Sequence, residues 1–448
     1  MLTAATEDPR AAGVYHPAVG LSQFPLDELP VRFQPTVPMQ PLSLAKTYAG
    51  RDLSLYIHIP FCVTRCYFCT FTTVVGRRVS AELIARYLEA LQVELSMYAS
   101  LLAPAGAVVR SVQIGGGTPT TLTAAQLEGL LDFIHDRFNC ARLQEIILEA
   151  FPTSIDPEKA RLIVQFPNLK INLGVQSFDD GVLAAVGRRH EGQQALKAVD
   201  LLRSLPFKSV GIDLIYGLPN STTTVVMEDV RLADQLGVDH LALYPLWVYP
   251  RTTLYALQRQ GKASVPTIQE KRKQLSAAQE QLEAIGFNQY TVFHSNRYER
   301  HEHFYGRWQM EDRDWLGAGQ GAVSHLNGVL YQNVVDIHEY MDRASRGLEA
   351  AREGRVLDPH ERFVRSFLYG LRLWPFPEAL FEGRFGIGVD RVFGHELSVL
   401  ERQGLVERFD HSIRLTPEGV LRLGSIEAYL SNGFDGAEPV MSAEVPVL

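Results

Sequence analysis

The chain has 448 residues, of which 46% are hydrophobic and 21% are charged, and its formal net charge is −8. This length exceeds one ordinary core, so two or three units are expected, and the acidic balance argues against a nucleic-acid-binding surface. The chain contains no apolar run of the roughly 20 residues that span a bilayer and no secretory signal pattern at its start, so we expect a cytoplasmic protein with no membrane partner.

Residues 1–50 are rich in proline, at positions 9, 17, 25, 30, 35, 38 and 41. Proline fixes φ and removes a backbone donor, which disfavours helices and central strands. We therefore interpret this segment as an extended arm that lies on the body of the protein, or as a partly disordered one.

Residues 52–245 alternate short apolar runs with longer amphipathic stretches. The pattern predicts strands at 53–59, 109–114, 145–149, 170–175, 210–215 and 240–244. It predicts helices at 80–99, where Ser80 is a cap, and at 123–138, 156–164, 192–204 and 222–236. Six strands separated by helices favour parallel βαβ units that curve into a complete or partial barrel.

The remainder of the chain has a different pattern of predicted elements. A helix is predicted at 268–285, followed by an irregular polar-aromatic segment at 290–309. From about residue 355 helices predominate, and 388–403 with a short β pair at 404–406 and 413–416 resembles a winged-helix unit. The last 15 residues are expected to form a flexible tail.

Three of the four cysteines, Cys62, Cys66 and Cys69, fall within eight residues with the spacing C-x3-C-x2-C. A 4Fe–4S cluster normally takes four cysteines, so three thiolates leave one iron open. An open iron can bind the amino and carboxylate groups of S-adenosylmethionine (SAM). An electron passed into the sulfonium then cleaves a carbon–sulfur bond and gives a carbon radical. The alternative is a structural zinc site, whose fourth ligand would be His58, Cys140 or a distant histidine.

Polar groups and glycines recur where the predicted strands end. Gly115-Gly116-Gly117-Thr118 follows the second strand, where glycine lets the backbone approach a ligand. Glu149, Gln176 with Ser177, and Asp213 lie on later strands, where polar groups face the active mouth of a parallel barrel. Each of these features alone is equally compatible with a tight turn or a buried polar residue. Arg188 and Arg189 could bind a carboxylate, but they are also compatible with ordinary surface charge.

Aromatic and histidine side chains crowd residues 290–308, including Tyr290, His294 and Trp308. Such a stretch suits a flat, conjugated ligand. It is also compatible with a loop packed over the barrel mouth.

Five segments together resemble the oxygen-independent coproporphyrinogen III oxidase-like family of the radical SAM superfamily: LYIHIPFCVTRCYFCTF, QIGGGTPT, LGVQSF, GIDLIYGLP and WLGAGQGAVS. The resemblance covers roughly residues 50–430. It implies an α/β fold with a partial (β/α)6 TIM-type barrel and a C-terminal, mostly helical, winged domain. It also implies a 4Fe–4S cluster on Cys62, Cys66 and Cys69, one SAM bound to that cluster, and a second SAM.

The resemblance also assigns SAM contacts. They are Tyr56, Phe68, Gly116, Gly117, Thr118, Glu149, Gln176, Arg188 and Asp213, with Leu246 or Trp247, Ala318 and Gly319 around a second SAM. The expected units are an arm (1–50), a radical SAM core (51–250), an extension with the substrate and second-SAM region (251–350), the C-terminal domain (351–432) and the tail (433–448). We expect a monomer that takes electrons from a flavodoxin or ferredoxin and acts on an aromatic or conjugated small molecule.

The family divides by function. Coproporphyrinogen III dehydrogenases carry an Arg-Tyr-Thr-Ser-Tyr-Pro-type arm that this chain lacks, and often a further cysteine where Phe71 stands. The heme-chaperone branch carries His-Asn-x-x-Tyr-Trp, and here residues 301–306 read HEHFYG. These losses favour the third branch, methyltransferases and cyclopropanating enzymes of natural-product (antibiotic) pathways, which in some cases work with a partner methyltransferase. Glu149, Tyr290 and His294 are the candidate bases for such a transfer. The dehydrogenase and the heme carrier remain the alternatives.

Overall fold

The computed structural model describes residues 37–38 and 51–432. The expected arm, apart from 37–38, and the expected tail lie outside the described residues. Residues 37–38 form strand β1 (Val37–Pro38), which pairs antiparallel with β15 (Ala351–Val356).

Six consecutive parallel strands form the centre of the large sheet. They are β2 (Asp52–Ile59), β5 (Val108–Gly116), β6 (Glu145–Ala150), β7 (Leu169–Gln176), β8 (Ser209–Tyr216) and β9 (His240–Pro245). They are the six strands expected from the sequence. Their nearly continuous burial explains their unbroken apolar runs, because a parallel sheet covered on both faces has no solvent side.

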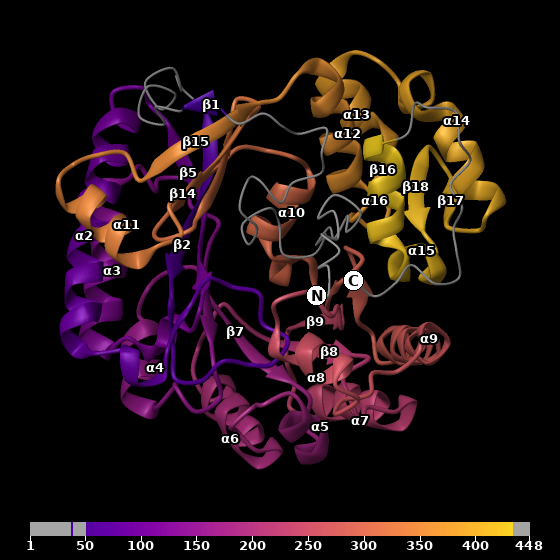
Figure 1. Ribbon diagram of the computed structural model, residues 1–448, viewed down its shortest axis with the longest axis horizontal. Coiled ribbons are helices and arrows are strands. Elements are labelled where there is room, and N and C mark those ends of the chain that lie inside the picture. Colours follow the sequence, from indigo (N-terminus) through magenta and orange to yellow (C-terminus); the bar gives the residue numbers. More distant parts are fainter. Residues whose placement is uncertain (1–36, 39–50, 433–448) are drawn as a thin grey trace, which may run out of the picture.

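Helices follow most of these strands and lie around the outside of the curved sheet (Figure 1). They are α2 (Ala81–Leu102), α3 (Ala124–Arg137), α4 (Pro157–Ile163), α5 (Asp180–Ala185), α6 (Gly192–Arg203) and α7 (Thr223–Gln235). The Ser80 hydroxyl accepts a hydrogen bond from Leu83 N and caps α2 as expected, and Thr123 with Gln126 forms a capping box on α3.

Short strands extend the sheet at both edges. At one edge β12 (Trp315–Ala318) runs parallel to β2, and β13 (Val323–Leu326), β14 (Val329–Asn333) and β15 continue antiparallel. At the other edge β11 (His294–Asn296) and β10 (Asn288–Gln289) follow β9. β1 and β10 are the two ends of this sheet in the described part of the chain, so the sheet is a partial barrel.

The segment between β9 and β12 is more regular than its composition suggests. It contains α8 (Thr253–Arg259), α9 (Ile268–Ala284), a 3-10 turn η7 (Glu299–His301) and α10 (Phe304–Met310). α10 contacts β5 and the C-terminal helix α12 (Pro359–Gly370). It therefore links the barrel to the C-terminal region.

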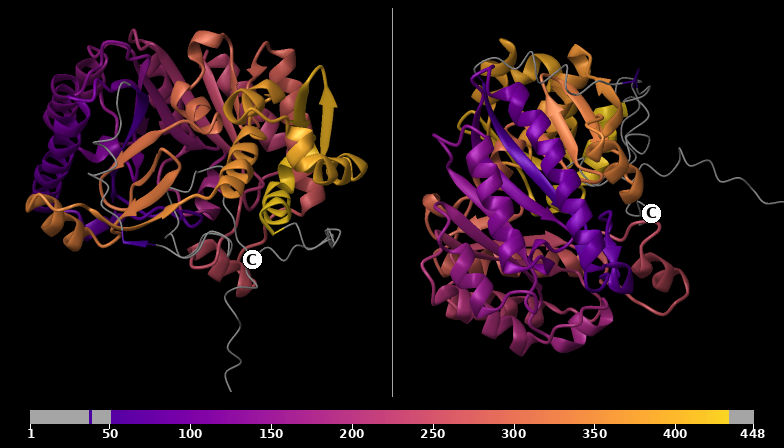
Figure 2. Two further views of the ribbon diagram at one scale, coloured as in Figure 1. Left: turned by 90° about the horizontal axis from the view of Figure 1, so that it is seen from above. Right: turned by 90° about the vertical axis from the view of Figure 1, so that its left-hand side faces the viewer.

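The C-terminal region is mostly helical, as expected. It contains α12, α13 (Glu378–Phe385), α14 (Val389–Arg402), α15 (Pro417–Leu421) and α16 (Leu423–Asn432), and α11 (Ile337–Ser345) precedes it. A small sheet of β16 (Phe376–Pro377), β18 (Ser412–Leu415) and β17 (Val406–Phe409) forms the wing. α11 packs on α2, whereas α13–α16 lie at the opposite end of the molecule (Figure 2).

Among the helices of the described residues, none is long and apolar enough to cross a bilayer.

Candidate functional site

The three clustered cysteines lie on one loop at the carboxyl end of β2. β3 (Phe61–Cys62) pairs in parallel with β4 (Val74–Val75), so the loop closes on itself around Cys66 and Cys69. A turn in which Cys69 N donates to Cys66 O at 3.1 Å brings the last two cysteines together. Chain topology therefore places the three thiols on one loop.

Each thiol has a polar partner. Thr118 Oγ1 lies 3.5 Å from Cys62 Sγ, and Arg188 Nη1 donates to Cys66 Sγ at 3.2 Å. The Phe71 backbone N–H donates to the Cys69 thiol. Burial raises the pKa of Cys62 to about 11 and that of Cys69 to about 12. The half-buried Arg188 guanidinium and the N–H and O–H donors offset that cost when the thiols ionise, so the residues present fit an anionic iron–sulfur cluster.

The sequence left a structural zinc site open as the alternative. Within residues 51–432, no three His, Cys, Asp or Glu side chains are grouped so as to hold one metal ion. His58 is occupied on the strand: its Nδ1 pairs with the Tyr56 hydroxyl at 3.0 Å and its Nε2 with Thr72 O at 3.1 Å.

The glycine turn at the end of β5 is fastened to the cysteine loop. Gly117 N donates to Ile59 O and Thr118 N to Phe61 O, both at 2.8 Å. A Cβ at Gly117 would lie 2.8 Å from Phe61 O. Gly116 has φ +104°, and a Cβ there would lie 2.5 Å from the His58 ring. Close packing and backbone conformation therefore both require glycine at 116.

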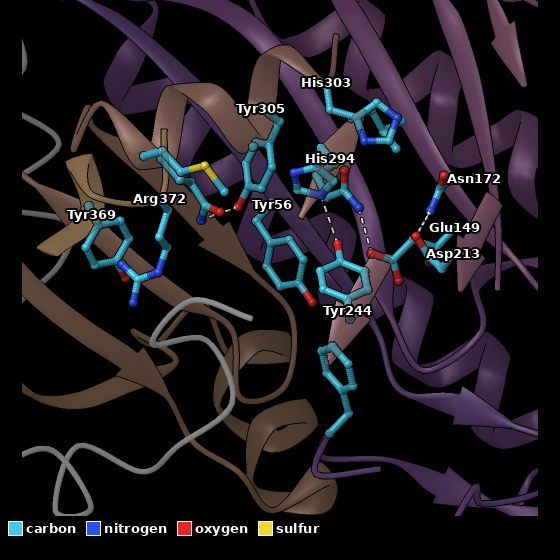
Figure 3. A pocket seen from close by; sticks show the side chains of 16 residues that line it. Tyr56, Glu149, Asn172, Asp213, Tyr244, His294, His303, Tyr305, Tyr369 and Arg372 are labelled. Carbon is cyan, nitrogen blue, oxygen red and sulfur yellow. Dashed lines mark hydrogen bonds between the residues drawn. The ribbon is translucent and has the colours of Figure 1, made fainter. Parts of the chain in front are cut away.

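A cavity of about 140 Å³ lies beside this loop, against the middle and carboxyl halves of the barrel strands (Figure 3). The strand register sets lining residues of neighbouring strands side by side. Tyr56 is level with Gln113, and Gln113 is level with Ile147. Glu149 is level with Asn172. Tyr369 and Arg372 lie at one end of the cavity, and Glu149, Asn172 and Asp213 at the other (Figure 3).

Two carboxyl groups, those of Glu149 and Asp213, line one end of the cavity. Glu149 accepts from Gln113 Nε2 and Asp213 from Asn172 Nδ2, both at 2.7 Å. Burial, together with the charge of Asp213, raises the pKa of Glu149 to about 7, and burial raises the pKa of Asp213 to about 6. This end of the cavity thus favours a cation or a hydrogen-bond donor.

Aromatic rings and a histidine line the middle of the cavity. Tyr56 and Tyr305 stack with centroids 6.4 Å apart. His294 is engaged at both nitrogens, by the Tyr244 hydroxyl at 2.9 Å and the Thr291 hydroxyl at 2.8 Å. Burial lowers the pKa of His294 to about 4, so its ring is neutral at neutral pH.

The structure brings only some of the sequence-predicted residues together at the cavity. Tyr56, Glu149, Asp213 and His294 line it. Tyr290 does not: its hydroxyl lies 2.8 Å from His240 Nε2 and accepts from His303 N at 2.9 Å. Gly116, Gly117, Thr118 and Arg188 belong to the surroundings of the cysteine loop.

The remaining expected SAM contacts lie apart from this cavity. Phe68 packs in a separate apolar cluster with Leu246. Trp247 packs edge-on against Phe293 at 5.8 Å. Gln176 ends β7 at a bulge with φ +73°.

Ala318 and Gly319 also lie outside the cavity lining, at the end of β12 beside β2. Ala318 pairs with Ile57, and Gly319 N donates to the buried carboxylate of Glu94 at 2.8 Å.

Several lining residues were not anticipated as ligand contacts. They are Phe71, Gln113, Asn172, Tyr244, Tyr369 and Arg372. Gln113 and Asn172 could have been found from the strand pairing, because they lie level with Tyr56 and Glu149 and face the same cavity. Tyr369 and Arg372 enter from the end of α12, which no local pattern links to the barrel.

Comparison with known proteins identifies the chain's relatives. The Radical SAM superfamily model matches residues 56–233 and the HemN C-terminal domain model matches residues 357–422. Heme chaperone HemW of Lactococcus lactis is 30% identical, over 82% of this chain and 94% of that protein. Oxygen-independent coproporphyrinogen III oxidase of Synechocystis is 29% identical, over 91% of each. The structure of Escherichia coli coproporphyrinogen III oxidase (HemN) superposes with a TM-score of 0.72 and 26% identity, covering 87% of this chain and 92% of that one.

These relatives correct one prediction. Methyl or methylene transfer in a natural-product pathway is wrong, and with it the partner methyltransferase, because the matches are heme chaperones and coproporphyrinogen oxidases. The expectation rested on three departures from the family, namely the missing arm motif, Phe71 in place of a cysteine, and the sequence of residues 301–306. In the last of these segments, the Glu302 carboxylate pairs with Arg307 on α10 at 2.8 Å.

The fold prediction is confirmed, and so are the cofactors, which are a 4Fe–4S cluster and SAM. By its matched domains and by its relatives, this chain belongs to the radical SAM superfamily, in the group that carries a HemN C-terminal domain and includes the HemW heme chaperones and the oxygen-independent coproporphyrinogen III oxidases.

Proposed function

We propose that this chain is a radical SAM oxidoreductase that oxidatively decarboxylates a porphyrinogen of the coproporphyrinogen III type. One observation carries this proposal. A single cavity joins the cysteine loop, through Phe71 and Tyr56, to a buried cation, Arg372, at its far end. The names of the Synechocystis and Escherichia coli relatives support the substrate class.

In this proposal Cys62, Cys66 and Cys69 hold the cluster and leave one iron for SAM. Bound together, cluster and SAM supply a 5′-deoxyadenosyl radical that abstracts hydrogen. Arg188 donates to Cys66 Sγ and so stabilises the thiolate form, and Thr118 does the same for Cys62.

Glu149 and Asp213 form the anionic end of the cavity. Both have a raised pKa in the ligand-free protein because burial disfavours their charge. A bound ammonium or ribose hydroxyl would reverse that cost by pairing with the carboxylates. These two side chains are therefore proposed to orient SAM, with Gln113 and Asn172 fixing their rotamers through the hydrogen bonds described above.

The opposite end suits a carboxylate. Arg372 is 3% exposed, stacks over Tyr369 and is paired with Glu427, while its Nε has no hydrogen-bond partner in residues 51–432. A propionate placed toward this end would gain a charge-assisted partner. Loss of a hydrogen atom from the propionate, followed by loss of CO2 and one electron to an acceptor, gives a vinyl group.

A second candidate is a heme carrier. His303 lines the cavity and stacks on His240 with centroids 3.6 Å apart, and imidazole is a common axial ligand of heme iron. The match to HemW of Lactococcus lactis, 30% over 94% of that protein, supports this alternative.

One experiment separates the two. Protein reconstituted without oxygen is incubated with coproporphyrinogen III, SAM and a reductant, and products are separated by mass spectrometry. The oxidase proposal expects vinyl-containing porphyrinogen together with 5′-deoxyadenosine. Unchanged porphyrinogen, combined with stoichiometric heme binding that His303→Ala abolishes, would establish the carrier instead.

A further inference from the structure

The outer side of the cysteine loop carries an unusual apolar side chain. Val63 directly follows Cys62 and is 72% exposed, more than any other large hydrophobic side chain in residues 51–432. A single exposed valine is ordinary on a protein surface. Its position matters here because it is one residue from a proposed cluster ligand.

Three arginines lie on the same loop as this valine or on the turn beside it. Arg65 directly precedes Cys66 on the same loop, and it is exposed. Arg77 and Arg78 lie on the turn η5 (Gly76–Arg78), which follows β4. Since β4 pairs with β3, with Cys62 opposite Val75, this turn lies beside Val63.

Within residues 37–38 and 51–432, the side chains of these arginines are accessible to a partner. All three are exposed, and none is paired with an acidic side chain in the part of the chain that the structure describes. The whole chain, in contrast, carries 51 acidic and 43 basic residues. A concentrated basic patch on an acidic protein directs a partner of opposite charge to one face.

We propose that Val63, Arg65, Arg77 and Arg78 form the docking face for an acidic one-electron carrier protein. The inference rests on the proposed SAM-cleaving function, because each reductive cleavage of SAM consumes one electron from outside the cavity. The reduced carrier gives up that electron and leaves oxidised, and the electron enters through the loop that bears the thiols. Interfaces of redox partners are small and transient, which suits one exposed valine within a basic rim.

The test uses flavodoxin, an acidic FMN protein, and the full chain with its cluster. Binding of labelled, oxidised flavodoxin is followed by fluorescence anisotropy, and reduction of the cluster by reduced flavodoxin is followed by stopped-flow absorbance. The double variant Arg77→Glu/Arg78→Glu leaves the cysteines and Arg65 in place. We expect its Kd for flavodoxin to rise about tenfold or more and cluster reduction to slow in proportion, while reduction by a small-molecule reductant stays unchanged.

Arg391→Glu/Arg402→Glu is the matched control. It makes the same change in net charge on α14, in the C-terminal region, where both arginines are exposed. Wild-type binding should also weaken as ionic strength rises from about 0.01 M to about 0.15 M, since the screening length falls from about 30 Å to about 8 Å.

Equal flavodoxin binding by both double variants would overturn the docking face. So would tighter binding of a short DNA duplex than of flavodoxin at this face. Both readouts omit a porphyrinogen, so failure of the proposed decarboxylation would leave them unchanged.

Discussion

Replacement of Gly116 by alanine tests how tightly the glycine turn at the end of β5 packs against the cysteine loop. Gly116 has φ +104°, a conformation that costs other residues about 1–3 kcal/mol. The added Cβ would lie 2.5 Å from the His58 ring, and overpacking of this kind costs about 1–3 kcal/mol more. We therefore expect Gly116→Ala to lose about 2–6 kcal/mol of stability, a large share of the typical 5–15 kcal/mol.

The same change should also weaken binding of the iron–sulfur cluster. His58 is the side chain displaced, and its Nε2 bonds to Thr72 O, on the far end of the cysteine loop. Iron content after anaerobic reconstitution should therefore fall along with the midpoint of urea unfolding. Gly129→Ala, on α3, is the matched control: a Cβ there meets nothing within 4 Å, and alanine in a helix should stabilise by about 0.5–1 kcal/mol. Wild-type stability and iron content in Gly116→Ala would refute the packing argument.

Four further predictions follow from the same contacts. Cys66→Ala should abolish the cluster chromophore and SAM cleavage, whereas Cys140→Ala, on a partly buried cysteine outside the loop, should keep both; iron loss in the latter would place Cys140 among the ligands. Arg188→Met should lower cluster occupancy and shift the reduction potential to more negative values, because the cation beside Cys66 Sγ is lost; an unchanged potential would contradict this role. Burial raises the pKa of Glu94 from 4.5 to about 7, so its contribution to stability is present below about pH 4.5 and is lost as pH rises through 7, up to about 3 kcal/mol; Glu94→Gln should remove that part of the pH dependence of urea unfolding. Phe71→Ala should raise the KM for porphyrinogen more than it lowers kcat, since the ring lines the cavity and the backbone N–H that serves Cys69 remains; loss of the cluster absorbance would point to a structural role instead.

Much of the barrel could be predicted from the sequence because its strands are buried on both faces. Unbroken apolar runs such as that of β2, and caps such as Ser80 and Thr123, are local signals that need no tertiary information. The extension β12 to β15 was missed for the opposite reason. These strands are short and contain glycine and polar residues such as Gly317 and His325, which are buried only by their neighbours.

The same distinction applies to the candidate site: some of its residues have local sequence signals, and others depend on tertiary packing. Cysteine spacing and polar residues at strand ends indicated the thiol loop, Glu149 and Asp213 before any fold was known. Arg372 escaped notice because its position depends on α12 packing against α10, far away in sequence. Tyr290 was a plausible base by composition alone, but its hydroxyl is already engaged by His240 and His303. Which residues face a cavity is a property of packing that periodicity does not report.

Cluster spectroscopy with isotopically labelled SAM tests the central claim most directly. The reduced, reconstituted protein is examined by electron paramagnetic resonance and electron–nuclear double resonance, with and without SAM carrying 15N in its amino group. Three cysteine ligands predict a changed spectrum on SAM addition and a 15N coupling that shows direct binding to iron. A spectrum that SAM leaves unchanged, from a cluster with four protein ligands, would contradict the account.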